Sequence, residues 1–291
     1  MKLQLTTILY FISNILFIAF RTVQILCFTE KDTAFLMPQY MPLTISVCAV
    51  GLLLLGIIFI NALYKPRMPK DIKAKTVPSL AVSAVSGVLY AVSGVLYTLD
   101  HKSISFFLVI SVAAALTCIL YGFTEFFGYE FPRFATLILI ITWIYEFITS
   151  YLFYSTKPLR FRTILETLAV AFVVLFFISF GKLKSGVKQA RNIRLLYPLG
   201  LIASTLCFVS LVPEFIAWSF GEPAKITESC VSQAALLSAG IFTAFISLGC
   251  FKRQPKGQAE ELPELTEEEM PFYMEPVENF RVVNINVDNK E

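Results

Sequence analysis

Charged side chains are scarce in this sequence. Only 15% of its 291 residues are Asp, Glu, Lys or Arg, whereas 56% are hydrophobic. The charge content is too low, and the hydrophobic content too high, for a soluble globular protein of this length. The composition therefore indicates an integral membrane protein and excludes a soluble domain of ordinary size.

Histidine is almost absent, because His101 is the only one in the chain. A single histidine excludes a histidine-rich metal site and an HExxH metalloprotease. The segment GKLKSG at 181–186 lacks the GK[ST] ending of a phosphate-binding loop, and neither GxSxG nor GxGxxG occurs. We expect no metal and no cofactor. An enzyme acting on membrane lipids is the least favoured class, because no nucleophile can be named for it.

Long hydrophobic runs take the place of charged segments. A helix needs roughly 20 mostly apolar residues to cross the hydrocarbon core, and these runs are too continuous for barrel strands. We therefore predict an all-α fold, a polytopic bundle of about eight transmembrane helices within residues 1–251. The first run lacks the small-x-small cleavage site of a signal peptide, so we expect it to be retained. The runs occupy residues 3–20, 41–63, 77–99, 103–126, 134–153, 163–180, 197–220 and 229–251.

The basic residues indicate which side of the membrane each connection faces. Dense clusters at 65–75 and 182–194 fall on one side of the predicted bundle, together with Lys2, Arg133 and 252–256. Positive charges mark the cytoplasmic side. Both termini are therefore predicted to be cytoplasmic, in a multi-pass protein of the plasma or inner membrane. Topology explains the clusters, so the expected partner is the lipid bilayer and no nucleic acid.

The third run carries a ridge of small residues. It repeats the heptad AVSGVLY in tandem at 84–97. Seven residues are nearly two helical turns, so the small side chains recur close to one face. We expect this face to pack closely against another helix, with a hinge or a dimer face as alternatives. The ridge consists of Ser79, Ser83, Gly87, Ala91 and Gly94.

Four ionisable residues lie within or at the ends of the predicted helices. They are Arg21, Glu146, Glu166 and Glu214. A charged side chain is costly inside a bilayer, so each of the four should be paired or have a function. The predicted topology brings all four toward the outer side. Arg21 is the only cation expected at this depth. One arginine cannot neutralise three carboxylates, so at least one glutamate should be protonated, solvated or in contact with a solute.

Polar neighbours at helical spacing extend these positions into stripes that should face away from lipid. Gln24 extends the first stripe, and Ser210 and Trp218 flank Glu214. Pro213 removes a backbone hydrogen bond and is expected to open the helix there. Two interpretations remain. The charges either tie the helices together, or they line an outward-facing polar cavity that binds a small cationic or zwitterionic solute.

Aromatic residues gather at the predicted membrane boundaries. The segment 121–134 holds seven aromatic residues together with Glu125 and Glu130. This pattern is typical of an interfacial aromatic belt rather than a binding site. Trp143 and Trp218 are expected to be similar anchors at the outer boundary.

Two of the six cysteines are expected near the outer surface. Cys27 and Cys230 lie at the outer ends of the first and eighth runs. An oxidising outer surface allows a disulfide between them, although spacing alone does not fix their distance. The other four lie in apolar context and are expected to behave as small hydrophobic residues.

The composition changes abruptly after residue 251. Residues 252–291 contain ten acidic and five basic residues with four prolines, so we predict a disordered, acidic cytoplasmic tail. Residues 259–291 also interleave aromatic and β-branched side chains, as a segment that binds a cytoplasmic protein would. The leading functional hypothesis is a small-solute transporter or membrane solute-binding component. The alternative is a non-transporting sensor or scaffold that engages a partner through this tail.

Overall fold

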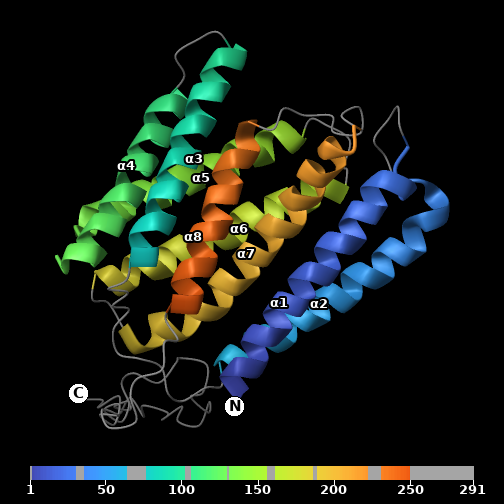
Figure 1. Ribbon diagram of the computed structural model, residues 1–291, viewed down its shortest axis with the longest axis horizontal. Helices are drawn as coiled ribbons and strands as arrows, with labels where there is room; N and C mark the ends of the chain where they lie inside the picture. The colour runs from blue at the N-terminus through green and yellow to red at the C-terminus, as the bar shows by residue number, and fades with distance from the viewer. Residues whose placement is uncertain are drawn as a thin grey trace, which may run out of the picture.

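The computed structural model describes residues 2–30, 36–63, 77–101, 106–129, 131–155, 161–185, 189–221 and 231–249. Almost all of them are helical, and the predicted all-α, polytopic helical bundle is confirmed (Figure 1). The α-helices are α1 (Lys2–Val23), α2 (Met41–Leu63), α3 (Val77–His101), α4 (Phe106–Phe127), α5 (Arg133–Ser155), α6 (Phe161–Lys184), α7 (Gln189–Ser219) and α8 (Val231–Gly249). A π-helical turn, η1 (Gln24–Phe28), extends α1, and a 3-10 turn, η2 (Pro38–Tyr40), precedes α2.

Seven of these helices are long and apolar enough to cross a membrane, and they are α1 to α7. The eighth, α8, has a shorter apolar segment, Gln233–Leu248. Residues 252–291, on which the disordered tail was predicted, lie outside the described residues. The cytoplasmic placement of the two termini stays a prediction.

Helix α7 is longer than the sequence suggested. It begins at Gln189, whereas the hydrophobic run predicted a start at 197, so both Pro198 and Pro213 lie inside one continuous helix. A proline inside a helix removes one backbone hydrogen bond. The polar segment before the run extends the helix beyond its apolar part, where hydropathy gives no signal.

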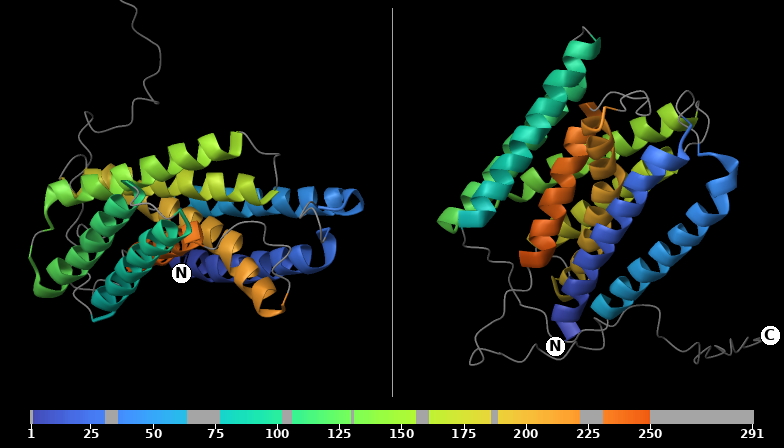
Figure 2. Two further views of the ribbon diagram at one scale, coloured as in Figure 1. Left: turned by 90° about the horizontal axis from the view of Figure 1, so that it is seen from above. Right: turned by 45° about the vertical axis from the view of Figure 1, so that its right-hand side comes forward.

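Helix α7 lies at the centre of the bundle. It packs against α1, α2, α6 and α8, while α3 packs against both α4 and α8. The α1–α2 hairpin lies at one side of the molecule and the α3–α4 hairpin at the other, as two directions of view agree (Figures 1 and 2). Helix α7 therefore brings α1, α6 and α8, which lie far apart in the sequence, close to one another.

Polar contacts attach α1 to α7 within the bundle. The hydroxyls of Tyr10 and Ser204 share a hydrogen bond of 2.8 Å, and Asn14 Nδ2 donates to Thr205 Oγ1 at 3.2 Å. Both pairs are buried. In hydrocarbon there is no water to replace a lost partner, so such contacts fix the rotation of α1 about its own axis.

The small-residue ridge of α3 lies against α4. A Cβ atom added to Gly87 would lie 2.7 Å from Ile119 Cγ1 and 2.9 Å from the carbonyl oxygen of Ala115. One added to Gly94 would lie 2.8 Å from the Cβ of Ser111. These distances are shorter than carbon and oxygen atoms tolerate, so the approach of the two helices depends on glycine at both heptad positions.

The neighbouring face of α3 contacts α8. Ser86, from the first heptad copy, and Ser238 each donate a side-chain hydrogen bond to the other's backbone carbonyl, at 3.4 and 2.8 Å. Ser93, at the same place in the second copy, is also fully buried. The tandem repeat thus supplies two adjacent packing faces, one for α4 and one for α8.

Aromatic rings fill the centre of the bundle. Trp143 has only 1% of its surface exposed and stacks on Phe177 with ring centroids 6.3 Å apart. Its ring also meets the edge of Tyr90. The prediction that Trp143 is an anchor at the outer boundary is therefore wrong. The face of α5 that carries it turns inward, and burial of an indole in a tightly packed core is strongly favourable.

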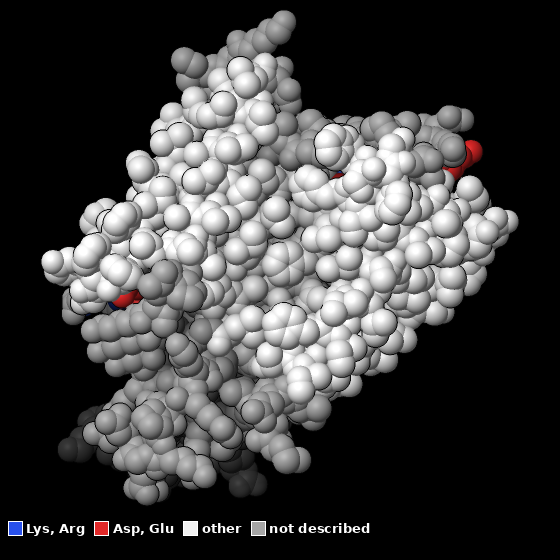
Figure 3. Space-filling view, in the orientation of Figure 1, with Lys and Arg blue, Asp and Glu red and all other residues white. Residues whose placement is uncertain are grey.

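The outer surface carries few charges. Large aliphatic side chains such as Leu53, Ile15 and Val109 are mostly exposed. Among the described residues, the face shown in Figure 3 is almost free of charged atoms. Such a surface is suited to contact with acyl chains.

The other end of the bundle from Arg21 carries a second charged contact. Lys184 Nζ lies 2.5 Å from Glu125 Oε1 and 5.2 Å from the centre of the Tyr121 ring. Glu125 is therefore an ion-pair partner that links α4 to α6, and not only a member of an aromatic belt. The pair joins residues 59 positions apart, which helical spacing cannot reveal. Glu130 lies outside the described residues.

The close approach of α3 and α4 predicts a strong effect at one glycine. We expect Gly87→Ala to lower the free energy of unfolding by about 1–3 kcal/mol, because the new methyl group meets a backbone carbonyl that cannot move away cheaply. Thermal unfolding in detergent measures the change. Gly56→Ala in α2 is the control, since no atom lies within 4 Å of its added Cβ, and it should stabilise by roughly 0.5–1 kcal/mol. Equal effects at the two positions would contradict this packing.

Candidate functional site

The candidate site lies where α1 and α7 end and where α6 and α8 begin. Arg21 is at the end of α1 and Glu214 is in the last turns of α7, while Glu166 and Gln233 lie near the starts of α6 and α8. Adjacent helices run in opposite directions, so these positions share one end of the bundle. Glu146 joins them from the second half of α5.

Arg162 is the central cation of this site. Its Nε atom lies 2.8 Å from Glu166 Oε1 on the same helix and 3.0 Å from Glu214 Oε1 on α7. Its side chain and those of both carboxylates are largely buried. Arg162 therefore joins α6 to α7 through charge-assisted contacts, which are the strong ones among hydrogen bonds.

The expectation that Arg21 is the only cation at this depth is wrong. The predicted sixth span begins at 163, which left Arg162 in a loop, whereas α6 begins at Phe161. Arg162 is consequently in the first helical turn, four residues before Glu166, where the two side chains share a face. The spacing of the two residues was a signal for this pair that the hydropathy boundary concealed.

Gln233 is a site residue that the sequence analysis missed. Its Nε2 atom donates a hydrogen bond of 2.6 Å to Glu214 Oε2. Only 1% of the residue is exposed. Glu214 thus has one oxygen on Arg162 and the other on Gln233, which ties α7 to both α6 and α8. An uncharged residue in a mainly apolar helix attracts no attention in a search for buried charge.

Arg21 and Gln24 form the part of the site contributed by the first helix. Arg21 donates to Gln24 Oε1, and Gln24 Nε2 donates to Thr44 Oγ1 of α2 at 3.1 Å. The π-helical turn holds Gln24, which is completely buried. Arg21 at the end of α1 and Arg162 at the start of α6 lie at the same end of the bundle.

Glu146 lies beside a small cavity at this end of the bundle. The cavity has a volume of about 30 Å³ and is bounded by α5, α6 and α8. Its polar walls come from Glu146, Ser150, Glu166 and Gln233, with Trp143 beside them. In this measure, about 10–15 Å³ is enough to hold one water molecule. The polar space is therefore large enough for one small particle.

The structure places the predicted site residues Ser210 and Trp218 in different surroundings. Ser210 is buried one turn before Glu214, but no hydrogen bond reaches its hydroxyl from the described part of the chain. Trp218 is 62% exposed, and its assignment to the site stays a prediction. Position 218 is one turn after Glu214, where the end of α7 leaves the bundle. Its exposed indole fits the boundary anchor that was its other predicted role.

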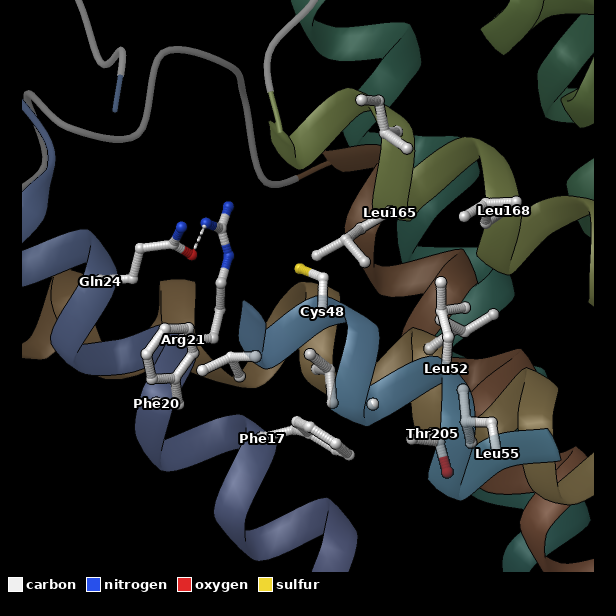
Figure 4. A pocket seen from close by; sticks show the side chains of 15 residues that line it. Phe17, Phe20, Arg21, Gln24, Cys48, Leu52, Leu55, Leu165, Leu168 and Thr205 are labelled. Atoms are coloured by element: carbon white, nitrogen blue, oxygen red, sulfur yellow. Dashed lines mark hydrogen bonds between the residues drawn. The ribbon is translucent and has the colours of Figure 1, made fainter. Parts of the chain in front are cut away.

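A larger cavity lies on the other side of Arg21, with a volume of about 200 Å³. Arg21 and Gln24 lie at one end of it, and leucines of α2 and α6 lie at the other (Figure 4). Apart from these two residues its lining is nearly all apolar. This cavity therefore does not have the chemistry of the polar cavity that was expected.

Cys27 is exposed and carries a free thiol. The disulfide with Cys230 that the sequence allows is thus not formed in this structure. Cys230 itself lies outside the described residues. Cys48, a free cysteine of α2, lines the larger cavity.

This end of the bundle carries charges of both signs. Within the described part of the chain, the glutamates Glu166 and Glu214 contact Arg162, whereas no ion pair reaches Glu146. No group of three His, Cys, Asp or Glu side chains in the described part of the chain is placed to hold a metal ion.

Comparisons with models of protein families, with curated proteins and with solved structures found no match to this chain.

Substitution of Arg162 tests how much its ion pairs contribute to the free energy of unfolding. We expect Arg162→Gln to lower the free energy of unfolding by about 3 kcal/mol, because it leaves Glu214 buried without its main counter-charge. The double variant Arg162→Gln with Glu214→Gln should be more stable than Arg162→Gln alone, since the buried charge is then gone. Arg133→Gln, at an exposed arginine, is the control and should change little. A double variant that loses the sum of the two single losses would contradict a direct contact.

Proposed function

We propose that this chain binds a small cationic solute at the end of the bundle that holds Arg21, Arg162 and Glu214, and carries it across the membrane. The observation that supports this most is the position of Arg162 Nε, within 3.0 Å of carboxylates from two helices. A guanidinium in this position occupies the place that a cationic ligand would take. Glu146 adds a carboxylate that no ion pair reaches within the described part of the chain, which favours a cation over an anion.

An exchange of cations at Glu214 provides a mechanism. Arg162 and Glu166 lie on the same helix, four residues apart, so their contact survives any rigid movement of α6. The contact of Arg162 with Glu214 joins two helices and is the one that a solute can replace. A bound cation would then neutralise Glu214 while α6 and α7 become free to separate. Binding energy is thereby converted into helix movement, as a two-state carrier requires.

The size and polarity of the site limit the solute. Glu214 is buried, and its two carboxylate oxygens contact Arg162 and Gln233. A solute that replaces Arg162 at this carboxylate must therefore be small, unless the helices separate first. Short amines and ammonium-like cations fit these limits best, because their N–H groups can replace those of Arg162 at the carboxylate.

The two alternative interpretations make different demands. If the charges only tie helices together, every substitution that disrupts them should lower the amount of folded protein together with any activity. A scaffold acting through the acidic tail concerns residues 259–291, which lie outside the described residues. The polar cluster is the observation that favours the carrier, because buried charges are costly unless they have a partner or a task.

Uptake of radiolabelled methylammonium into proteoliposomes tests the proposal. We expect Glu214→Gln to lower uptake at least about tenfold, a loss of about 1.4 kcal/mol in solute binding, while the amount of protein in the membrane is unchanged. Glu125→Gln is the matched control, because this glutamate is also buried and paired with a cation but lies at the other end of the bundle. It should retain uptake.

Two results would contradict the carrier. One is the absence of saturable uptake by the wild-type protein. The other is a loss of uptake in Glu214→Gln that matches a loss of folded protein, as judged by its elution from a size-exclusion column. The second result would leave the charges with a structural role only.

A further inference from the structure

We infer that the cavity between α5, α6 and α8 is a binding site for one small monovalent inorganic cation, held by Glu146 and Gln233. This site is separate from the contact of Arg162 with Glu214. Its use as the coupling ion of a carrier rests on the proposed function, but its existence as a cation site does not.

Glu146 differs from the other two glutamates of the cluster. Glu166 and Glu214 both contact Arg162. Within the part of the chain that the structure describes, no ion pair or hydrogen bond reaches the carboxylate of Glu146. It is half-buried and forms a wall of the cavity. A carboxylate in this position gains most from a cation placed in the cavity itself.

Gln233 provides an independent observation at the same cavity. Its amide donates through Nε2 to Glu214, and this contact fixes which side of the amide carries the oxygen. The Oε1 atom is buried and accepts no hydrogen bond from the residues that the structure describes, although Gln233 lines the cavity. A buried amide oxygen without a partner costs about 1–3 kcal/mol. A cation in the cavity would remove this cost and that of the Glu146 charge together.

Charge and size define the class of ligand. Glu146 contributes one carboxylate that no ion pair reaches within the described part of the chain, so a monovalent cation matches its charge. The cavity of about 30 Å³ is large enough for a sodium or ammonium ion, whereas choline is a quaternary ammonium that offers these ligands neither an N–H donor nor a bare ion. Carboxylate, amide and hydroxyl oxygens, the last from Ser150, are the hard ligands that such ions prefer.

The position of Gln233 connects this cavity to Glu214. Gln233 donates to Glu214 through its amide nitrogen and is also one of the residues that line the cavity. A cation that attracts Oε1 will orient the amide and strengthen the hydrogen bond from Nε2. Occupancy of the cavity is thereby communicated to the carboxylate at which the solute is proposed to bind. A proton on Glu146 competes with the cation. Among the described residues, the titratable groups near Glu146 are Glu166 on α6, Tyr90 on α3 and Tyr145 on α5.

Trp143 offers a direct measurement, because it lines the cavity and the chain has only one other tryptophan. In the variant Trp218→Phe, all indole fluorescence comes from Trp143. The full-length variant in lipid nanodiscs is titrated with NaCl and with NH4Cl, and with choline chloride and CaCl2 as controls. We expect a saturable change with NaCl or NH4Cl and none with either control. The half-saturating concentration should rise as the pH falls, since protons compete for Glu146.

Substitutions then assign the response to the site. Adding Glu146→Gln should abolish the change, and Gln233→Leu should raise the half-saturating concentration about tenfold, the effect of one ligand worth about 1.4 kcal/mol. Glu125→Gln, at the far end of the bundle, should leave the response as it was. If Glu146→Gln fails to fold, Glu146→Asp serves instead and should respond with weaker affinity, because its carboxylate is withdrawn by one methylene group.

Three results would overturn the cation site. They are no response to NaCl or NH4Cl, a response that persists in Glu146→Gln, and a response to pH alone without cation dependence, which would make the cavity a proton site only. None of these depends on transport. A cation response without methylammonium uptake would leave the site standing and remove the carrier. Uptake that depends on Glu214 without a cation response would do the reverse.

Discussion

The ion pairs of Arg162 are the interaction on which the arrangement of the helices depends at this end of the bundle. Hydrocarbon cannot solvate an isolated carboxylate, so Glu166 and Glu214 must be neutralised, protonated or hydrated. One guanidinium meets both, on α6 and on α7. Because Gln233 brings α8 to the same carboxylate, three helices converge on a single charged group. The apolar packing elsewhere determines how closely helices approach, whereas this contact determines which of their ends meet.

The helices and the buried acids could be predicted from the sequence because both leave strong local signals. Long apolar runs identify spans, and a glutamate within such a run is conspicuous by its cost. Arg162 and Gln233 could not be found this way. The arginine lay one residue outside a hydropathy boundary, and the glutamine carries no charge. Trp143 and Trp218 were treated alike, yet one is in the core and the other is exposed, because helix rotation depends on neighbours that the sequence does not identify.

The tandem heptad of α3 shows how a local pattern becomes a three-dimensional constraint. Its glycines allow α4 to approach, and Ser86 exchanges hydrogen bonds with α8. The sequence predicted the first of these faces but could not identify the helix that packs on it. Pairing between helices is a property of the whole bundle, since any small-residue ridge is compatible with many partners. Contacts such as that of Lys184 with Glu125 are beyond local inference for the same reason.

Helix α6 has a distinctive mechanical position, because it carries an ionic contact near each end. Arg162 holds α7 at one end and Lys184 holds α4 at the other. Both contacts together oppose a tilt of α6 relative to its neighbours. If the contact of Arg162 with Glu214 is lost, the contact of Lys184 with Glu125 still holds the other end, so α6 can tilt about that end and its first turns move furthest. Rearrangement would be largest near the buried carboxylates and smallest among the rings around Tyr121.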